Sequence, residues 1–315
     1  MQTKKKIFLA SYALTQRGKK WRVRLSYAAT VGMLVAFVYW GWQHRLTLQR
    51  VFVDFGPVKL MAICLLLTLG IVLSAWSFTI LVRSMGYQFA YQDGYHSLNL
   101  SQIAAMLPGK IWGLTGLVGL LWSRGVSKPD SALVIFLHTL LMLSAAVCVG
   151  ILGLLPTIGW GYTLLCLLPL LLLLTGHSWC ETLRARFLGN SSALPSARNL
   201  CLVLLVGLGS WIVVSACFAL LVYGLEAPGL VSPFLVTSAF AAGYVGGVVN
   251  PVMPAGLGVR EGIITLILGA NLGNEQALAV ALVFRMLHTA VLWLHIAITL
   301  SILSLDARVV QKDPC

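Results

Sequence analysis

Long runs of apolar residues, separated by short polar segments, make up most of the chain. Six of these runs have 18 residues or more, enough for a helix to cross a hydrocarbon core of roughly 30 Å. They cover residues 25–42, 58–82, 131–155, 158–175, 200–223 and 277–305, with a tight turn expected at Pro156 between the third and fourth. This pattern predicts an all-α polytopic membrane protein with about six full spanning helices.

Two further apolar stretches are interrupted in the middle. Residues 97–122 are broken by Leu107-Pro108-Gly109-Lys110, and residues 232–272 are broken by the Gly- and Pro-rich segment 250–258. The halves of the first stretch have about a dozen residues each, which is too short to span a membrane. We therefore expect two re-entrant pairs, in which a half-helix enters the membrane and a second one returns to the same side.

The positions of the basic residues support this topology. With both broken stretches re-entrant, 16 of the 22 Lys and Arg fall on one side, three on the other, and three within the membrane. The positive-inside rule makes the first side cytoplasmic, so both termini are expected in the cytoplasm. The predicted organisation is a basic cytoplasmic segment, a single integral membrane domain and a short cytoplasmic tail, at residues 1–24, 25–305 and 306–315.

The two re-entrant pairs also resemble each other in sequence. Residues 108–113 (PGKIWG) echo residues 254–260 (PAGLGVR), and a Leu-His-Thr sequence follows each pair, with its histidine at His138 and His288. The predicted topology gives the two units opposite orientations. Inverted repeats that each contain a broken helix are typical of alternating-access transporters.

Composition and charge exclude several other classes. The chain is 59% hydrophobic and 10% charged, whereas soluble domains are about a quarter charged. Its net charge of +13 comes from clusters beside apolar runs, without the interleaved aromatic residues of a nucleic-acid surface, so no nucleic-acid partner is expected. The seven cysteines include no CxxC pair, and common enzyme motifs are absent. We expect no metal, no cofactor and no catalytic residues.

Four ionisable residues lie deep in the predicted membrane: Lys110, Arg260, Glu261 and Arg285. A buried charge there is costly and needs a partner or a wet cavity. Lys110 and Arg260 lie at the starts of half-helices, where free N–H groups already favour an anion such as a lipid phosphate. Glu261 and Arg285 either guide that headgroup or form a structural pair that locks the second half-helix to the last span.

The last span carries a polar stripe, because Arg285, His288, Thr289, His295 and Thr299 are spaced to lie near one face. This stripe either lines a path for a headgroup or protons, or forms hydrogen bonds between helices. His138 is expected to be an ordinary packed histidine. Ala239, Gly243 and Gly247 recur every four residues and predict close approach of another helix.

Residues 254–262 (PAGLGVREG) resemble the motif of the flippase-like membrane domain of lysylphosphatidylglycerol synthases and their stand-alone relatives. Asn99, the LPGKIWG sequence at 107–113 and the SRGVS sequence at 123–127 are similar to the family's first motif. The resemblance covers roughly residues 23–305. It implies translocation of a lipid across the bacterial inner membrane, in pathways associated with envelope glycans, polyprenyl phosphates or hopanoids. No soluble domain for aminoacyl transfer is recognisable.

The resulting hypothesis is a flippase for an anionic or phosphate-bearing lipid, such as a phospholipid or a polyprenyl-phosphate-linked sugar. Its partners would be that lipid and enzymes of an envelope glycan pathway. Two alternatives are a membrane-embedded transferase that uses a polyprenyl-phosphate donor, for which Asp54 is a lone outer-loop acid, and an accessory subunit of a glycan pathway. The expected substrate-binding residues are Lys110, Arg260, Glu261, Arg285, Asn99, Asn250, Gly109, Gly256, Gly258 and His288.

Overall fold

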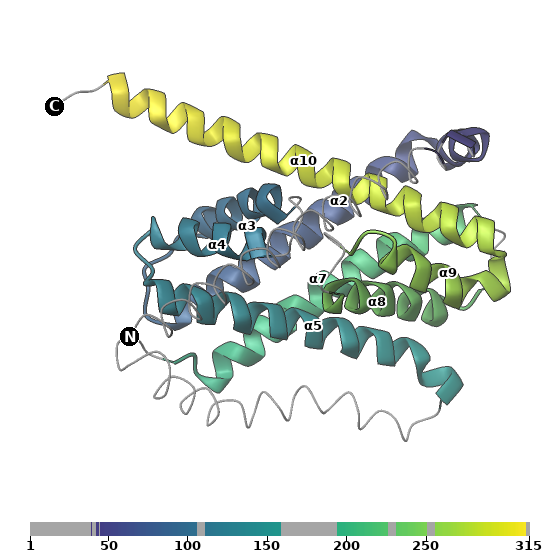
Figure 1. Ribbon diagram of the computed structural model, residues 1–315, viewed down its shortest axis with the longest axis horizontal. Helices are drawn as coiled ribbons and strands as arrows, with labels where there is room; N and C mark the ends of the chain where they lie inside the picture. Colours follow the sequence, from purple (N-terminus) through teal and green to yellow (C-terminus); the bar gives the residue numbers. More distant parts are fainter. Residues whose placement is uncertain are drawn as a thin grey trace, which may run out of the picture.

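The protein is built from helices throughout the part that the computed structural model describes (Figure 1). The structure describes residues 39, 42–43, 45–105, 111–158, 194–225, 231–250 and 256–312. The helices are α2 (Arg45–Ser84), α3 (Tyr91–Ala105), α4 (Ile111–Trp122), α5 (Lys128–Ile158), α7 (Ala197–Leu225), α8 (Pro233–Val249), α9 (Val259–Leu272) and α10 (Asn274–Lys312). The predicted all-α membrane fold is confirmed.

Four of the predicted spans are present as long apolar helices. Segments of α2, α5, α7 and α10 are long and apolar enough to cross a membrane: Phe55–Ser84, Lys128–Ile151, Ala197–Gly224 and Asn274–Ser304. The other two predicted spans, 25–42 and 158–175, lie almost entirely outside the described residues. The predicted N-terminal basic segment also lies outside them.

Each predicted re-entrant stretch forms two helices that pack against each other. We call α3 with α4 the first hairpin, and α8 with α9 the second hairpin. α4 has 12 residues and α9 has 14, so neither reaches the roughly 20 residues of a full span. α3 begins at Tyr91, earlier than expected, because its polar first turn is stabilised by the carboxylate of Asp93, which accepts a hydrogen bond from the N–H of Ala90 at 3.2 Å.

Glycines bring the two helices of each hairpin together. A Cβ at Gly113 in α4 would lie 2.9 Å from the Cβ of Ala105 in α3. In the second hairpin, a Cβ at Gly243 in α8 would lie 2.9 Å from the carbonyl oxygen of Arg260 in α9. The close approach predicted from the small-residue repeat of α8 is therefore present.

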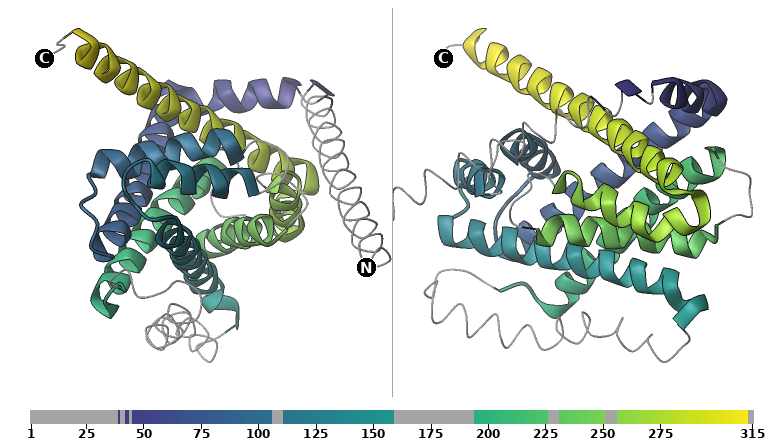
Figure 2. Two further views of the ribbon diagram at one scale, coloured as in Figure 1. Left: turned by 60° about the vertical axis from the view of Figure 1, so that its left-hand side comes forward. Right: turned by 45° about the vertical axis from the view of Figure 1, so that its right-hand side comes forward.

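The chain order of hairpin followed by long helix occurs twice. α5 follows the first hairpin and α10 follows the second, and the two hairpins lie at opposite ends of the longest axis of the molecule (Figure 1). α5 packs against α8 of the second hairpin, while α10 crosses from α9 to α2 and α3 (Figure 2). Each long helix therefore connects one hairpin to the region of the other.

Two local expectations were wrong. The tight turn at Pro156 is absent, because α5 continues through this proline to Ile158. The segment before the second span, which includes Asp54, is helical rather than an open loop. It joins the span at a kink, where Gly56 has a φ of 69° and Pro57 lacks an N–H.

Candidate functional site

The start of α9 is shaped by two glycines with positive φ. Gly256 has a φ of 67° and Gly258 a φ of 77°, a backbone region that other residues seldom adopt. Gly258 is the N-cap of α9, and its N–H donates a hydrogen bond to Oε2 of Glu261 at 2.7 Å. This turn places Arg260 and Glu261 in the first helical turn, directly after the break in the second hairpin.

Glu261 forms the ion pair that the sequence suggested. Nη1 of Arg285 on α10 lies 2.6 Å from Oε1 of Glu261, and the two side chains are 15% and 4% exposed. Both carboxylate oxygens of Glu261 are therefore engaged, one by α10 and one by the N-cap of its own helix. Removing one partner of such a buried pair would leave a charge in a low-dielectric environment.

Arg260 lies beside this pair but makes a different kind of contact. Its guanidinium carbon is 4.6 Å from the ring centre of Phe240 on α8, and 5.8 Å from those of Tyr244 and Phe284. Aromatic rings at these distances stabilise a cation through their quadrupoles. Among the described residues, none forms an ion pair or a hydrogen bond with this guanidinium.

Two of the rings that contact Arg260 belong to a buried aromatic cluster. Phe218 of α7, Phe240 of α8 and Phe284 of α10 have ring centres 5.1 to 5.2 Å apart and are almost completely buried. His288, one turn after Phe284, stacks on its ring at 6.3 Å. Three helices therefore hold the rings that position the guanidinium, and such packing of rigid side chains keeps the site pre-formed.

The structure brings together most, but not all, of the predicted site residues. Six of them lie around the start of α9: Gly256, Gly258, Arg260, Glu261, Arg285 and His288. Asn250 ends α8, where its N–H bonds to the carbonyl of Gly246. Lys110 and Gly109 lie outside the described residues. Asn99 lies in a separate polar group.

This second polar group lies where α2, α3 and α10 meet. The hydroxyl of Tyr95 is 2.6 Å from Nδ1 of His295, and Nε2 of His295 is 3.2 Å from the hydroxyl of Thr68. Asn99 lies one turn after Tyr95 on α3. The sequence analysis missed Thr68 and Tyr95. The four-residue spacing of Tyr95 and Asn99 on a broken helix was the available signal.

His138 behaves as the packed histidine that was expected. Its Nε2 lies 3.0 Å from the hydroxyl of Ser77 on α2, and its ring meets that of Phe78 edge-on at 5.1 Å. The residue is buried within the bundle. The Leu-His-Thr sequences of α5 and α10 thus occupy different environments, because His288 lies over the aromatic cluster near Arg260.

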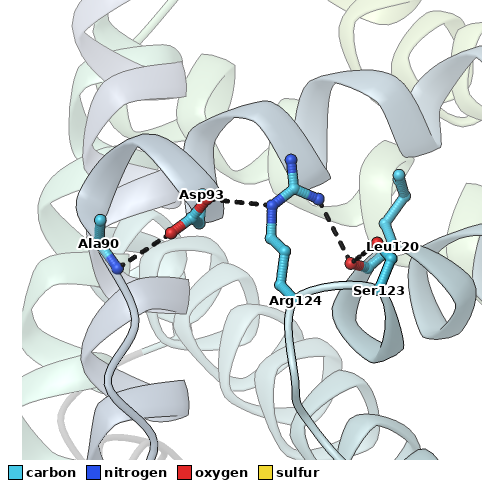
Figure 3. A network of polar contacts seen from close by, with 5 residues as sticks. All are labelled: Ala90, Asp93, Leu120, Ser123 and Arg124. Atoms are coloured by element: carbon cyan, nitrogen blue, oxygen red, sulfur yellow. Dashed lines mark hydrogen bonds and ion pairs between the residues drawn. The ribbon is translucent and has the colours of Figure 1, made fainter. Parts of the chain in front are cut away.

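An ion pair joins the two ends of the first hairpin (Figure 3). Nε of Arg124, just after α4, lies 3.1 Å from Oδ1 of Asp93 in the first turn of α3. Nearby, a cavity of about 640 Å³ is lined by Arg83, Tyr87, Gln88, Phe89, Ala90 and Asp93. Arg83 and Arg124, which are among the 16 basic residues that the predicted topology places on the cytoplasmic side, lie at the same end of the molecule.

The part of the chain that the structure describes has long apolar helices, two hairpins of shorter helices and a buried ion pair at one hairpin. These features are those of an all-α polytopic membrane protein. The family model of the lysylphosphatidylglycerol synthase TM region matches residues 21–296, and the chain belongs to this family. No curated protein matches it. Family membership supports a lipid-related role in a membrane, and the predicted resemblance is confirmed.

Proposed function

We propose that the protein translocates an anionic or phosphate-bearing lipid across the bacterial inner membrane. The observation that carries this proposal is Arg260. Its guanidinium is held among three aromatic rings within the helix bundle, and no described residue forms an ion pair or a hydrogen bond with it, although Glu261 is its neighbour in sequence. A guanidinium presents a planar fork of donors that matches a phosphate, and a lipid phosphate would complete this site.

The charge of the described residues supports an anionic headgroup. Arg260 and Arg285 contribute two positive charges, and Glu261 offsets one of them through its ion pair with Arg285. Because uncompensated charge is costly in a membrane, the positive charge that remains among these described residues favours an anionic headgroup over a neutral one.

In the proposed mechanism, the headgroup enters the bundle at the second hairpin while the acyl or prenyl chains remain in lipid. Arg260 binds the phosphate, and Glu261 holds Arg285 and the start of α9 in place. The proposed location has both termini in the cytoplasm, with the end that carries Arg83 and Arg124 on the cytoplasmic side. Translocation itself needs no bond to be made or broken, so the protein would not act as an enzyme.

The test is a flipping assay in proteoliposomes with a fluorescent phosphatidylglycerol, in which dithionite destroys the label on the outer leaflet. Arg260→Gln removes the charge and keeps a polar side chain of similar length. The rate should fall about 30-fold or more, as expected when one partner of a desolvated charged contact is lost.

Arg198→Gln is the matched control, because it makes the same change at an exposed arginine near the start of α7. Its flipping rate should equal that of the wild type. Circular dichroism and gel filtration check that both variants are folded. If folded Arg260→Gln protein flips the lipid at the wild-type rate, the proposed phosphate site is wrong.

A further inference from the structure

The polar group between α2, α3 and α10 contains no acidic or basic pair, unlike the site around Arg260. Thr68, His295 and Tyr95 form a chain of contacts through hydroxyl, imidazole and phenol groups. A neutral imidazole completes this chain in either tautomer, because each ring nitrogen has a neighbour that can both donate and accept a hydrogen bond. The chain therefore needs no charge in order to form.

Two side chains that flank this chain have polar atoms without a partner. Nδ2 of Asn99 and Oγ1 of Thr299 are buried and make no hydrogen bond, and the residues are 2% and 0% exposed. Asn99 lies one turn after Tyr95 on α3, and Thr299 lies one turn after His295 on α10. Buried polar atoms are nearly always satisfied in proteins, so two unsatisfied atoms on either side of one polar contact indicate a missing partner.

We infer that α3 and α10 form a second, uncharged subsite that binds hydroxyl groups of the substrate headgroup through Asn99 and Thr299. An amide N–H₂ group donates to a hydroxyl oxygen, and a threonine hydroxyl both donates and accepts. These two neutral side chains supply no positive charge to offset the negative charge of a phosphate. This subsite is closed in the present conformation, so binding requires the first hairpin to move away from α10.

The distance between the two sites specifies the substrate further. Arg285, which lies beside Arg260, and Thr299 are 14 residues apart on α10, which corresponds to about 21 Å along a helix axis. A headgroup that consists of a phosphate and a few atoms cannot reach both sites at once, whereas a phosphate that carries a chain of several sugars is long enough. Provided that the proposed function holds, the substrate class is a phosphate-linked glycolipid.

Two probe lipids with identical acyl chains separate the two sites. Phosphatidylmethanol carries a negative charge and no hydroxyl group, and monoglucosyldiacylglycerol carries sugar hydroxyls and no charge. Native mass spectrometry of the full-length protein in detergent measures how much of each lipid is retained, with diacylglycerol as the reference. The wild type should retain the glucosyl lipid more strongly than diacylglycerol.

Thr299→Val and Asn99→Leu remove the unpaired groups with little change in volume. Each should lower retention of the glucosyl lipid about three- to tenfold, as expected for one or two neutral hydrogen bonds, and leave phosphatidylmethanol unchanged. Thr299→Ser keeps the hydroxyl and should restore retention. Ser97→Ala and Ser215→Ala are matched controls, because both remove a buried unpaired hydroxyl elsewhere and should change neither probe. Gly94 of α3 packs against Thr79 of α2. Ser97 follows Gly94 by three residues, so it lies on the same side of α3, facing α2.

The outcomes distinguish the two proposals. Equal retention of the glucosyl lipid by wild type, Thr299→Val and Asn99→Leu would overturn the uncharged subsite. Loss of that lipid in the Ser97→Ala and Ser215→Ala controls as well would also overturn it, because the effect would then be general destabilisation. Arg260→Gln should lose phosphatidylmethanol alone; if it retains this lipid fully, the phosphate site fails while the uncharged subsite stands.

Discussion

The two hairpins share one architecture but carry their ion pairs in opposite places. In the first hairpin, Arg124 and Asp93 join the outer ends of α3 and α4, and their side chains are 18% and 39% exposed (Figure 3). In the second hairpin, Glu261 lies in the first turn of α9, next to the break, and its pair with Arg285 is almost completely buried. The contacts of the two hairpins with α10 differ as well. The first hairpin contacts α10 through the neutral side chain of Tyr95, and the second through the charged side chain of Glu261.

This difference shows that two hairpins of similar backbone can carry different polar groups in their interiors. Both hairpins use glycines for close helix contact, so their backbones are built in the same way. The exposed pair gains little free energy because water screens it, whereas the buried pair is strongly coupled to the fold. Three changes to the ion pairs and glycines test this comparison.

Glu261→Gln should have the largest effect on stability. The amide still accepts the hydrogen bond from the N–H of Gly258 but no longer neutralises Arg285, so the free energy of unfolding should fall by about 3 kcal/mol. Unfolding in mixed dodecyl sulfate and dodecyl maltoside micelles, followed by circular dichroism, measures this change. The double variant with Arg285→Gln should recover part of the loss. Unchanged stability with lost flipping would instead show that the pair serves transport.

Gly256→Ala tests the turn that precedes α9. A Cβ there would lie 2.7 Å from Cα of Gly247, at a φ of 67°, so the free energy of unfolding should fall by about 2 kcal/mol. Gly86→Ala is the control, because Gly86 has a φ of 90° but no atom within 4 Å of the added carbon. It should cost about 1 kcal/mol through the backbone alone. Equal losses in the same micelle assay would show that the contact with Gly247 is not tight.

Asp93→Asn should have the smallest effect, although it makes the same carboxylate-to-amide change as Glu261→Gln. The asparagine still accepts from the N–H of Ala90, and the lost ion pair is solvent-accessible, so the free energy of unfolding should fall by less than about 1 kcal/mol. Raising the salt concentration should reduce the difference further. A loss as large as that of Glu261→Gln would contradict the contrast between the two hairpins.

Much of the fold could be predicted because membrane spans are encoded locally. A helix satisfies its own backbone hydrogen bonds, so a long apolar run in α2, α5, α7 or α10 is enough to identify it. The breaks in the hairpins could also be predicted, since Pro and Gly interrupt apolar sequence at 107–110 and 250–258. The boundaries of the helices were harder to predict. The start of α3, for example, is stabilised by Asp93, which accepts hydrogen bonds from Ala90 and from Arg124, a residue beyond the end of α4.

The site could be predicted in part. Arg260, Glu261 and Arg285 were identifiable because charges are rare within apolar sequence, and the structure pairs two of them. The role of Phe240 and Phe284 could not be foreseen, since they are two among many apolar residues of α8 and α10. The contact of Tyr95 with His295 was equally hidden, because 200 positions separate the two residues.

The sequence by itself determined the membrane class, the helices, the two breaks and the presence of a few buried charges. These properties follow from apolar length and from local backbone chemistry. The tertiary structure decided which charge is paired and which faces aromatic rings, and it buried one polar atom each of Asn99 and Thr299 without a hydrogen-bond partner. Such contacts depend on how helices cross, and in uniformly apolar helices many crossings bury the same amount of surface, so packing detail selects among them.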